Sequence, residues 1–250
     1  MDRLQKDRML VKEIEQNWKV IRQVPQGNRS LAMEMAAVKQ DWHALQFIEN
    51  PCDSIKIVAI EQDWNAMQYI ENPNIAIQRL AIKKSPMAIK YIKEPKYEIL
   101  IDAVRRNWHA AKYIVNEKAL QYAVEKNVSA AKFIENPSEN LQMFIVDKDV
   151  KAVKWLKNPT KKVQLYVVGK NPKLIKYFDN PDRDVQLAAF NKDKSCAEFV
   201  KNPCQTIQSY LNRQVWLKEN ETSPDALDRY IQEYQAKMNK IMSDKNNNQL

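Results

Sequence analysis

Residues 50–73 read NPCDSIKIVAIEQDWNAMQYIENP, and the Asn-Pro pair at each end of this stretch returns along the chain at a fixed interval. The pair occurs at Asn50-Pro51, Asn72-Pro73, Asn136-Pro137, Asn158-Pro159, Asn180-Pro181 and Asn202-Pro203, with Glu94-Pro95 and Asn116-Glu117 in the two gaps. Every step is 22 residues except one of 20, from Glu117 to Pro137. A period of this length predicts stacked structural units that present an extended binding surface.

Each interval contains two apolar groups with helical spacing. Ile55, Ala59 and Ile60 form the first group, and Ala66, Met67 and Ile70 form the second. Spacings of three and four residues place apolar side chains on one helical face, so each repeat is expected to be a hairpin of two short helices, A and B. The Asn at the end of helix B tolerates the left-handed conformation and can also cap the next helix A, and the Pro is expected to take the first position of that helix. An Asp or Asn in the turn between A and B is expected to cap helix B.

The predicted fold class is all-α, an α-solenoid of stacked two-helix repeats with a capping C-terminal helix. Residues 1–28 are expected to form a degenerate N-terminal cap repeat, and 29–202 to form eight 22-residue helical hairpins. Residues 203–242 are expected to be C-terminal cap helices, because Leu227, Tyr230, Ile231 and Tyr234 recur at helical spacing after Ser223-Pro224. Residues 243–250 are expected to be a disordered tail.

Composition narrows the class further. The 250 residues are 44% hydrophobic and 28% charged, which is typical of a folded protein, and only two glycines occur. This scarcity argues against β-rich folds and against glycine-rich phosphate loops. No apolar run is long enough to span a membrane, and the N-terminus has no signal-peptide core. Cys52, Cys196 and Cys204 lack metal-ligand spacing, so reduced thiols and a cytoplasmic location are expected.

A motif of twelve residues is similar to one found in a known group of repeats. Residues 103–114 follow the pattern Ala-Val-x-x-Asn-Trp-x-Ala-Ala-Lys-Tyr-Ile, and residues 123–134 repeat most of it. This pattern resembles short helical-hairpin repeats of bacterial and phage proteins, catalogued mostly as a domain of unknown function, over roughly residues 29–202. The resemblance implies an α-solenoid and contributes no catalytic residue. The glycine usual in the middle of that motif is replaced here by Trp, Pro or Val.

Lysines recur at one position of helix B. Lys90, Lys112, Lys132, Lys154 and Lys176 occupy it in five consecutive repeats, pointing away from the apolar face. With hairpins stacked about 10 Å apart, they would line a strip on the order of 40 Å long. A basic surplus surrounds the last two, and Lys148, Lys151, Lys157, Lys161, Lys162, Lys170 and Lys173 would enlarge the field. Such a strip suits the backbone of a nucleic acid. The alternative is a solvated face on which each lysine pairs with a carboxylate of a neighbouring repeat.

Three further rows favour structural roles. Lys84, Arg106, Lys126, Lys148, Lys170 and Lys192 end helix A, where a cation complements the helix dipole. The aromatic row of Tyr69, Tyr91, Tyr113, Phe133, Trp155, Tyr177 and Phe199 could stack on bases, but packing between repeats is the favoured role. The glutamine row of Gln78, Gln142, Gln164, Gln186 and Gln208 allows hydrogen bonds either to base edges or between repeats.

Catalysis has little support in the sequence. The two histidines, His43 and His109, each follow a Trp at the same repeat position, which indicates a repeat feature rather than a metal pair or a general base. No enzyme activity, cofactor, metal or membrane association is expected. The sequence predicts a solenoid that binds RNA or single-stranded DNA through the lysines without strong sequence preference. The alternative is a scaffold that binds a protein partner, or a phage-type inhibitor of a host protein.

Overall fold

The computed structural model of the chain describes residues 3–219 and 225–247 and divides into two units. Unit 1 comprises the described residues up to Lys148, and unit 2 comprises those from Asp149 onward. All regular structure in the described ranges is helical, with no strand. The predicted all-α class is therefore confirmed.

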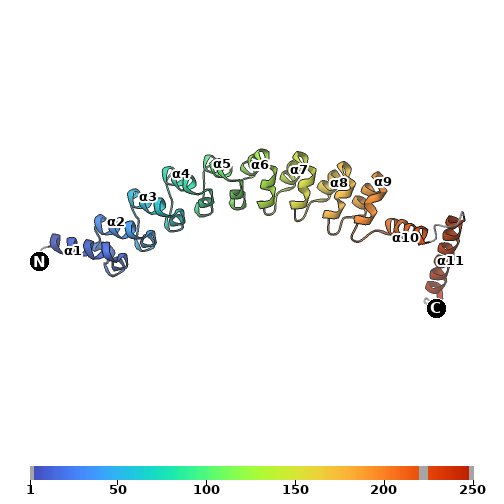
Figure 1. Ribbon diagram of the computed structural model, residues 1–250, viewed down its shortest axis with the longest axis horizontal. Coiled ribbons are helices and arrows are strands. Elements are labelled where there is room, and N and C mark those ends of the chain that lie inside the picture. Colours follow the sequence, from blue (N-terminus) through green and yellow to red (C-terminus); the bar gives the residue numbers. More distant parts are fainter. Residues whose placement is uncertain (1–2, 220–224, 248–250) are drawn as a thin grey trace. The chain divides into compact units, whose positions relative to one another are not determined.

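Unit 1 alternates α-helices with short 3-10 helices. The α-helices are α1 (Arg3–Gln16), α2 (Leu31–Gln40), α3 (Asp53–Gln62), α4 (Ile75–Lys84), α5 (Tyr97–Arg106), α6 (Glu117–Lys126) and α7 (Glu139–Lys148). The 3-10 helices are η1 (Trp18–Gln23), η2 (Gln26–Asn28), η3 (Trp42–Phe47), η4 (Trp64–Tyr69), η5 (Pro86–Tyr91), η6 (Trp108–Tyr113) and η7 (Val128–Phe133). Figure 1 shows α2 to α6 in chain order, each followed by its 3-10 helix on the same side of the row.

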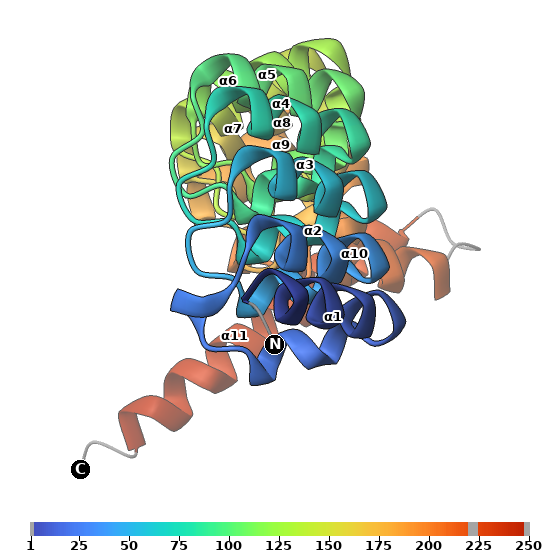
Figure 2. The same ribbon diagram turned by 90° about the vertical axis from the view of Figure 1, so that its left-hand side faces the viewer.

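Neighbouring hairpins of unit 1 pack in register. Each α-helix from α1 to α6 contacts the next α-helix, and η3 to η7 contact one another in chain order. Figure 2 looks along this unit from its N-terminal end and shows α1 to α6 following one another. The core lies between the two rows of helices, where Ile55, Ala59 and Ile60 of α3 meet Ala66 and Met67 of η4, all at most 1% exposed. Helices this short depend on such packing for their stability.

Unit 2 contains η8 (Val150–Trp155), α8 (Lys161–Lys170), η9 (Pro172–Tyr177), α9 (Arg183–Lys192), η10 (Lys194–Phe199), α10 (Gln205–Glu219) and α11 (Ala226–Asn247). Here η8 packs on η9, η9 on η10, and α8 on α9. The longer α11 packs on α10. The Tyr230 hydroxyl donates to the Ser209 carbonyl at 3.3 Å, and the Trp216 ring lies 5.5 Å from the Tyr230 ring.

The C-terminal segment differs in part from its prediction. The predicted helix start at Ser223-Pro224 lies outside the described residues. Helix α11 continues to Asn247, so the tail predicted from Ser243 is helical over 243–247, and residues 248–250 lie outside the described residues.

Helix B is a 3-10 helix of six residues, and a side chain fixes its start. The carboxylate of Asp63 accepts a hydrogen bond from the backbone N–H of Asn65 at 2.8 Å, which caps η4. The same bond recurs at Asp41, Ser85, Asn107, Asn127, Asp149, Asn171 and Asp193. The predicted cap of helix B is confirmed. Because side chains three apart eclipse in a 3-10 helix, its second and fifth residues share one face.

The Asn-Pro loop differs from its prediction in two respects. Asn50, Asn72 and Asn136 adopt the left-handed conformation, with φ of 50°, 46° and 50°, whereas Asn158, Asn180 and Asn202 do not have a positive φ. The Pro, however, does not begin helix A, because each α-helix starts two residues later and the residue between them is the N-cap. At that position, side chains of Asn74, Ser138 and Thr160 accept hydrogen bonds from the first helical turn. The Pro therefore lies in the loop, and the residue after it caps the α-helix.

The shortened repeat also lies elsewhere than predicted. The loop between η6 and α6 spans residues 114–116, whereas the corresponding loop between η4 and α4 spans 70–74. The side chain of Asn116 caps α6 by accepting the Ala119 N–H at 3.0 Å. Asn116 therefore occupies the N-cap position that Asn74 has in its repeat, not the position of the asparagine in an Asn-Pro pair. The two residues by which this repeat is shorter are missing from the loop before Glu117. This loop exposes Val115 to 98%.

Candidate functional site

The lysines predicted from the sequence lie on the 3-10 helices. Each is the fifth residue of its helix and is exposed: Lys90, Lys112 and Lys132 on η5, η6 and η7 of unit 1, and Lys154 and Lys176 on η8 and η9 of unit 2. We call these five residues the η-lysines. Because η5 to η7 pack consecutively, as do η8 and η9, the same position recurs on neighbouring helices within each unit.

Four of the η-lysines lie over aromatic rings. The Lys90 Nζ is 4.4 Å from the Tyr91 ring centroid and 5.0 Å from that of Trp64. The Nζ atoms of Lys112, Lys154 and Lys176 lie 5.9, 4.9 and 5.2 Å from the rings of Tyr113, Trp155 and Tyr177. Within residues 3–219 and 225–247, no carboxylate forms an ion pair with Lys90, Lys112, Lys154 or Lys176. A ring attracts an ammonium group without cancelling its charge, so these four charges remain uncompensated.

The other predicted lysines lie in three places. Lys151 and Lys173 are the second residues of η8 and η9, so each shares a face with the η-lysine three residues later. Lys157 is exposed in the loop after η8. The remainder lie on α-helices, with Lys148 at the end of α7 and Lys161, Lys162 and Lys170 on α8.

One of these lysines is already neutralised. The Lys161 Nζ lies 2.5 Å from Asp184 and 3.5 Å from Asp182. The hydrogen bond to Asp184 raises the pKa of Lys161, and the Asp182 charge adds to this effect. Lys161 therefore contributes little to an anion-binding field.

The row of cations at the ends of the α-helices has structural contacts. Lys84 donates to the carbonyl of Glu61 at 3.4 Å and pairs with its carboxylate, while Lys192 donates to the carbonyl of Gly169. Each accepting carbonyl is in the last turn of the preceding repeat's α-helix, which leaves carbonyls without intrahelical partners. Arg106 pairs with Asp102, and Lys126, Lys148 and Lys170 each lie over a ring four residues earlier. The dipole role predicted for this row is supported most directly at Lys84 and Lys192.

The glutamine row also serves the fold. The side-chain N–H groups of Gln78, Gln142, Gln164 and Gln186 donate to the carbonyls of Pro73, Pro137, Pro159 and Pro181, at 2.8–3.1 Å. These bonds tie each α-helix to the loop that precedes it. At Gln186 the side-chain oxygen also accepts the Cys204 N–H of the next repeat. The predicted bonding between repeats therefore occurs at Gln186, while bonds to the preceding loop are the general pattern.

The aromatic row divides into covered and open rings. Trp42, Trp64 and Trp108 lie 5.9, 6.1 and 5.1 Å from the rings of Tyr69, Tyr91 and Phe133 in the following repeat. Packing between repeats is thus confirmed for these three rings. By contrast, Tyr113, Tyr177 and Phe199 are 42%, 39% and 38% exposed.

The two histidines contact residues of their own 3-10 helices and the caps of those helices. His43 Nδ1 lies 2.7 Å from Asp41, the cap of η3, and the His43 ring stacks on Trp42. His109 repeats both contacts with Asn107 and Trp108. Across the described residues, no group of three or more His, Cys, Asp or Glu side chains could hold a metal ion. The three cysteines are free thiols.

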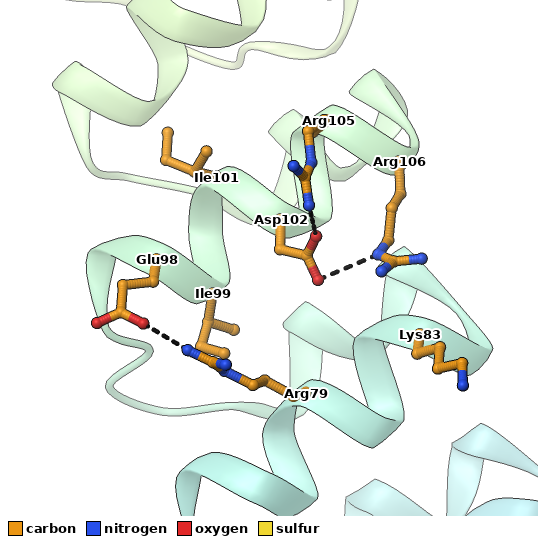
Figure 3. Close-up of a pocket in the computed structure, with 8 residues that line it drawn as sticks. All are labelled: Arg79, Lys83, Glu98, Ile99, Ile101, Asp102, Arg105 and Arg106. Carbon is orange, nitrogen blue, oxygen red and sulfur yellow. Dashed lines mark hydrogen bonds and ion pairs between the residues drawn. The ribbon is translucent and has the colours of Figure 1, made fainter.

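A groove of about 500 Å³ lies between α4 and α5 (Figure 3). Arg79 pairs with Glu98 at 2.7 Å across the groove, and Asp102 accepts hydrogen bonds from Arg105 at 2.7 Å and Arg106 at 3.1 Å. Burial alone would raise the pKa of Asp102, but the two arginines outweigh it and hold the pKa below its usual value. Lys83 adds a further cation to the lining, so basic residues outnumber acidic ones there.

None of the helices in the described ranges has a stretch long and apolar enough to cross a membrane. Comparison with protein-family models, curated proteins and solved structures returned no match, so the resemblance to phage and bacterial hairpin repeats stays a prediction.

Proposed function

We propose that this protein is a non-catalytic α-solenoid that binds a polyanion, RNA or single-stranded DNA. Binding takes place on the side of the hairpins formed by the 3-10 helices, which we call the η side. Consecutive packing of α-helices and of 3-10 helices within each unit supports a solenoid. Repetition of one lysine position on neighbouring helices supports a polymeric ligand with regularly spaced charges.

One observation carries the proposal. Lys90, Lys112, Lys154 and Lys176 are exposed and lack a carboxylate partner within the described residues, so the solvated, ion-paired alternative does not account for them. In unit 2, Lys151 and Lys173 add positive charge to the face that carries Lys154 and Lys176. A uniform position occupied by lysine contacts phosphates rather than base edges, which supports binding without strong sequence preference.

The test is a titration of the full chain with a fluorescent oligouridylate of ~20 nucleotides, followed by anisotropy across a salt series. We expect affinity to fall steeply with salt, because each phosphate contact on a single strand adds about −0.7 to the slope of log K against log salt. Charge reversal at Lys112, Lys132 and Lys154 should abolish binding at moderate salt. Unchanged binding by that variant would refute the proposal.

A second candidate function is a protein-binding scaffold, which the α side of unit 1 favours. Ile57, Ile75 and Tyr97, on α3, α4 and α5, are 42%, 38% and 49% exposed. The basic groove beside Arg79 adjoins these helices. A stoichiometric protein partner that survives nuclease treatment, and is lost in an Ile75→Asp/Tyr97→Asp variant, would favour this function over the first.

A further inference from the structure

Three of the aromatic rings that end a 3-10 helix are covered by the first residue of the preceding 3-10 helix. Where this residue is Trp, as at Trp42, Trp64 and Trp108, its ring packs against the ring of the following helix. Where it is Pro86, Val150 or Pro172, the following ring has no indole against it. These are the open rings Tyr113, Tyr177 and Phe199.

The open rings concentrate in unit 2 beside one lysine. Tyr177 ends η9, Phe199 ends η10, and these two helices pack together. The Lys176 Nζ lies 5.2 Å from the Tyr177 ring centroid and 6.0 Å from that of Phe199. An uncompensated ammonium group thus lies within reach of two exposed aromatic rings. Lys112 and Tyr113 repeat half of this arrangement in unit 1, at 5.9 Å.

We propose that Tyr177 and Phe199, with Lys176 between them, form a stacking site for unpaired nucleobases, and that Tyr113 with Lys112 forms a second. This inference rests on the proposed function and specifies its ligand as single-stranded. A base takes the place against the open ring that an indole takes in the Trp-bearing repeats, and the lysine contacts the adjoining phosphate. A duplex is a poor ligand because its base faces are already stacked on one another.

The arrangement favours a nucleobase over an aromatic side chain of a protein. Each open ring has a lysine beside it, and a single strand supplies both a planar ring and an anionic phosphate in every residue. An aromatic side chain of a protein supplies only the ring. Stacking also tolerates any base, which agrees with weak sequence preference.

The experiment measures the affinity of the full chain for a ~20-nucleotide oligouridylate and for an abasic strand of equal length and charge. Wild type should prefer the strand that carries bases. A Tyr177→Leu/Phe199→Leu variant, which keeps apolar bulk but removes both rings, should lose at least about 30-fold in affinity for oligouridylate. Its affinity for the abasic strand should change by no more than about twofold, because the phosphate contacts persist.

A Tyr69→Leu/Tyr91→Leu variant is the matched control, since it removes two covered rings from the same position. We expect it to retain the preference for bases, and thermal melting checks that both variants fold. Ultraviolet crosslinking of oligouridylate should label peptides that contain Tyr177 or Phe199.

If the Tyr177→Leu/Phe199→Leu variant binds oligouridylate like wild type, while salt-sensitive binding persists in both, stacking is refuted and the polyanion function stands. Stacking is also refuted if wild type binds the abasic strand, or a duplex, as tightly as it binds oligouridylate. If wild type binds neither strand even at low salt, the stacking site and the proposed function both fail.

Discussion

Removing η-lysines two at a time should lower the salt dependence of nucleic-acid binding by a fixed amount. The pairs are Lys90 with Lys112 in unit 1, and Lys154 with Lys176 in unit 2, each changed to Ala. All four are exposed and lack carboxylate partners in the described part of the chain, so each is free to contact one phosphate. Four contacts on a single strand give a slope of about −2.8 in log K against log salt.

That slope predicts specific losses of affinity. Between ~50 and ~200 mM salt, the four lysines should account for about a 50-fold fall in wild-type affinity. Either double variant keeps two of the contacts, so this component of the fall should shrink to about sevenfold. Both pairs should behave alike because they occupy the same helical position.

Anisotropy titrations with oligouridylate at several salt concentrations measure the slope directly. A Lys39→Ala/Lys83→Ala variant is the matched control, because both residues are exposed, lie near the ends of α2 and α4, and remove the same charge. Loss of the contacts between ammonium groups and rings should cost about 1 kcal/mol or less per site, so the variants should remain folded. A slope that falls equally in the control and the test variants would show that net charge, and not the η side, governs binding.

Three further predictions concern the fold. Asn72 has a φ of 46°, so Asn72→Ala should lower the free energy of unfolding in urea by about 1–2 kcal/mol, while Asn72→Gly should be near neutral; equal effects would contradict a conformational cause. Trp64→Leu should lower the melting temperature, because the aromatic pair with Tyr91 contributes about 0.5–1.5 kcal/mol beyond its buried area; an unchanged melting temperature would argue against this packing role. Asp102→Asn should be most destabilising above pH ~4: the folded pKa lies below the unfolded value of about 3.9, so the contribution of the carboxylate is lost as pH falls through the folded pKa. A difference from wild type that stays constant in urea unfolding from neutral to acidic pH would refute that linkage.

The apolar spacing was sufficient to predict the hairpins but not their helix types. Ala66, Met67 and Ile70 fit an α-helix and a 3-10 helix equally, because both place residues three apart on nearly one face. The 3-10 helix η4 begins at the Asp63 cap and has only six residues, which agrees with the short lengths of 3-10 helices in general. Neither feature produces a distinct hydrophobic pattern.

The sequence alone does not place the proline correctly, for a physical reason. Pro is common at the first helical position, which favours Pro73 there, although the next residue, Asn74, is itself a strong N-cap. Asn74, Ser138 and Thr160 all follow a repeat proline, and that recurrence of capping residues was the available signal. The cover of one repeat's ring by the preceding Trp was also missed, since it links positions 25 or 27 residues apart, from Trp108 to Phe133 or from Trp64 to Tyr91.

The six positions of a 3-10 helix make different contacts within the fold. The third and fourth residues, such as Ala110 and Ala111, are buried in the core, and the first and sixth pack between repeats wherever a Trp is present. The fifth residue serves neither purpose, and it is Gln46 and Gln68 in earlier repeats and Glu198 in η10. The fold therefore accepts an amide or a carboxylate at this position. Five consecutive lysines there do not follow from hairpin stability, and we infer that they reflect the charge of what the surface binds.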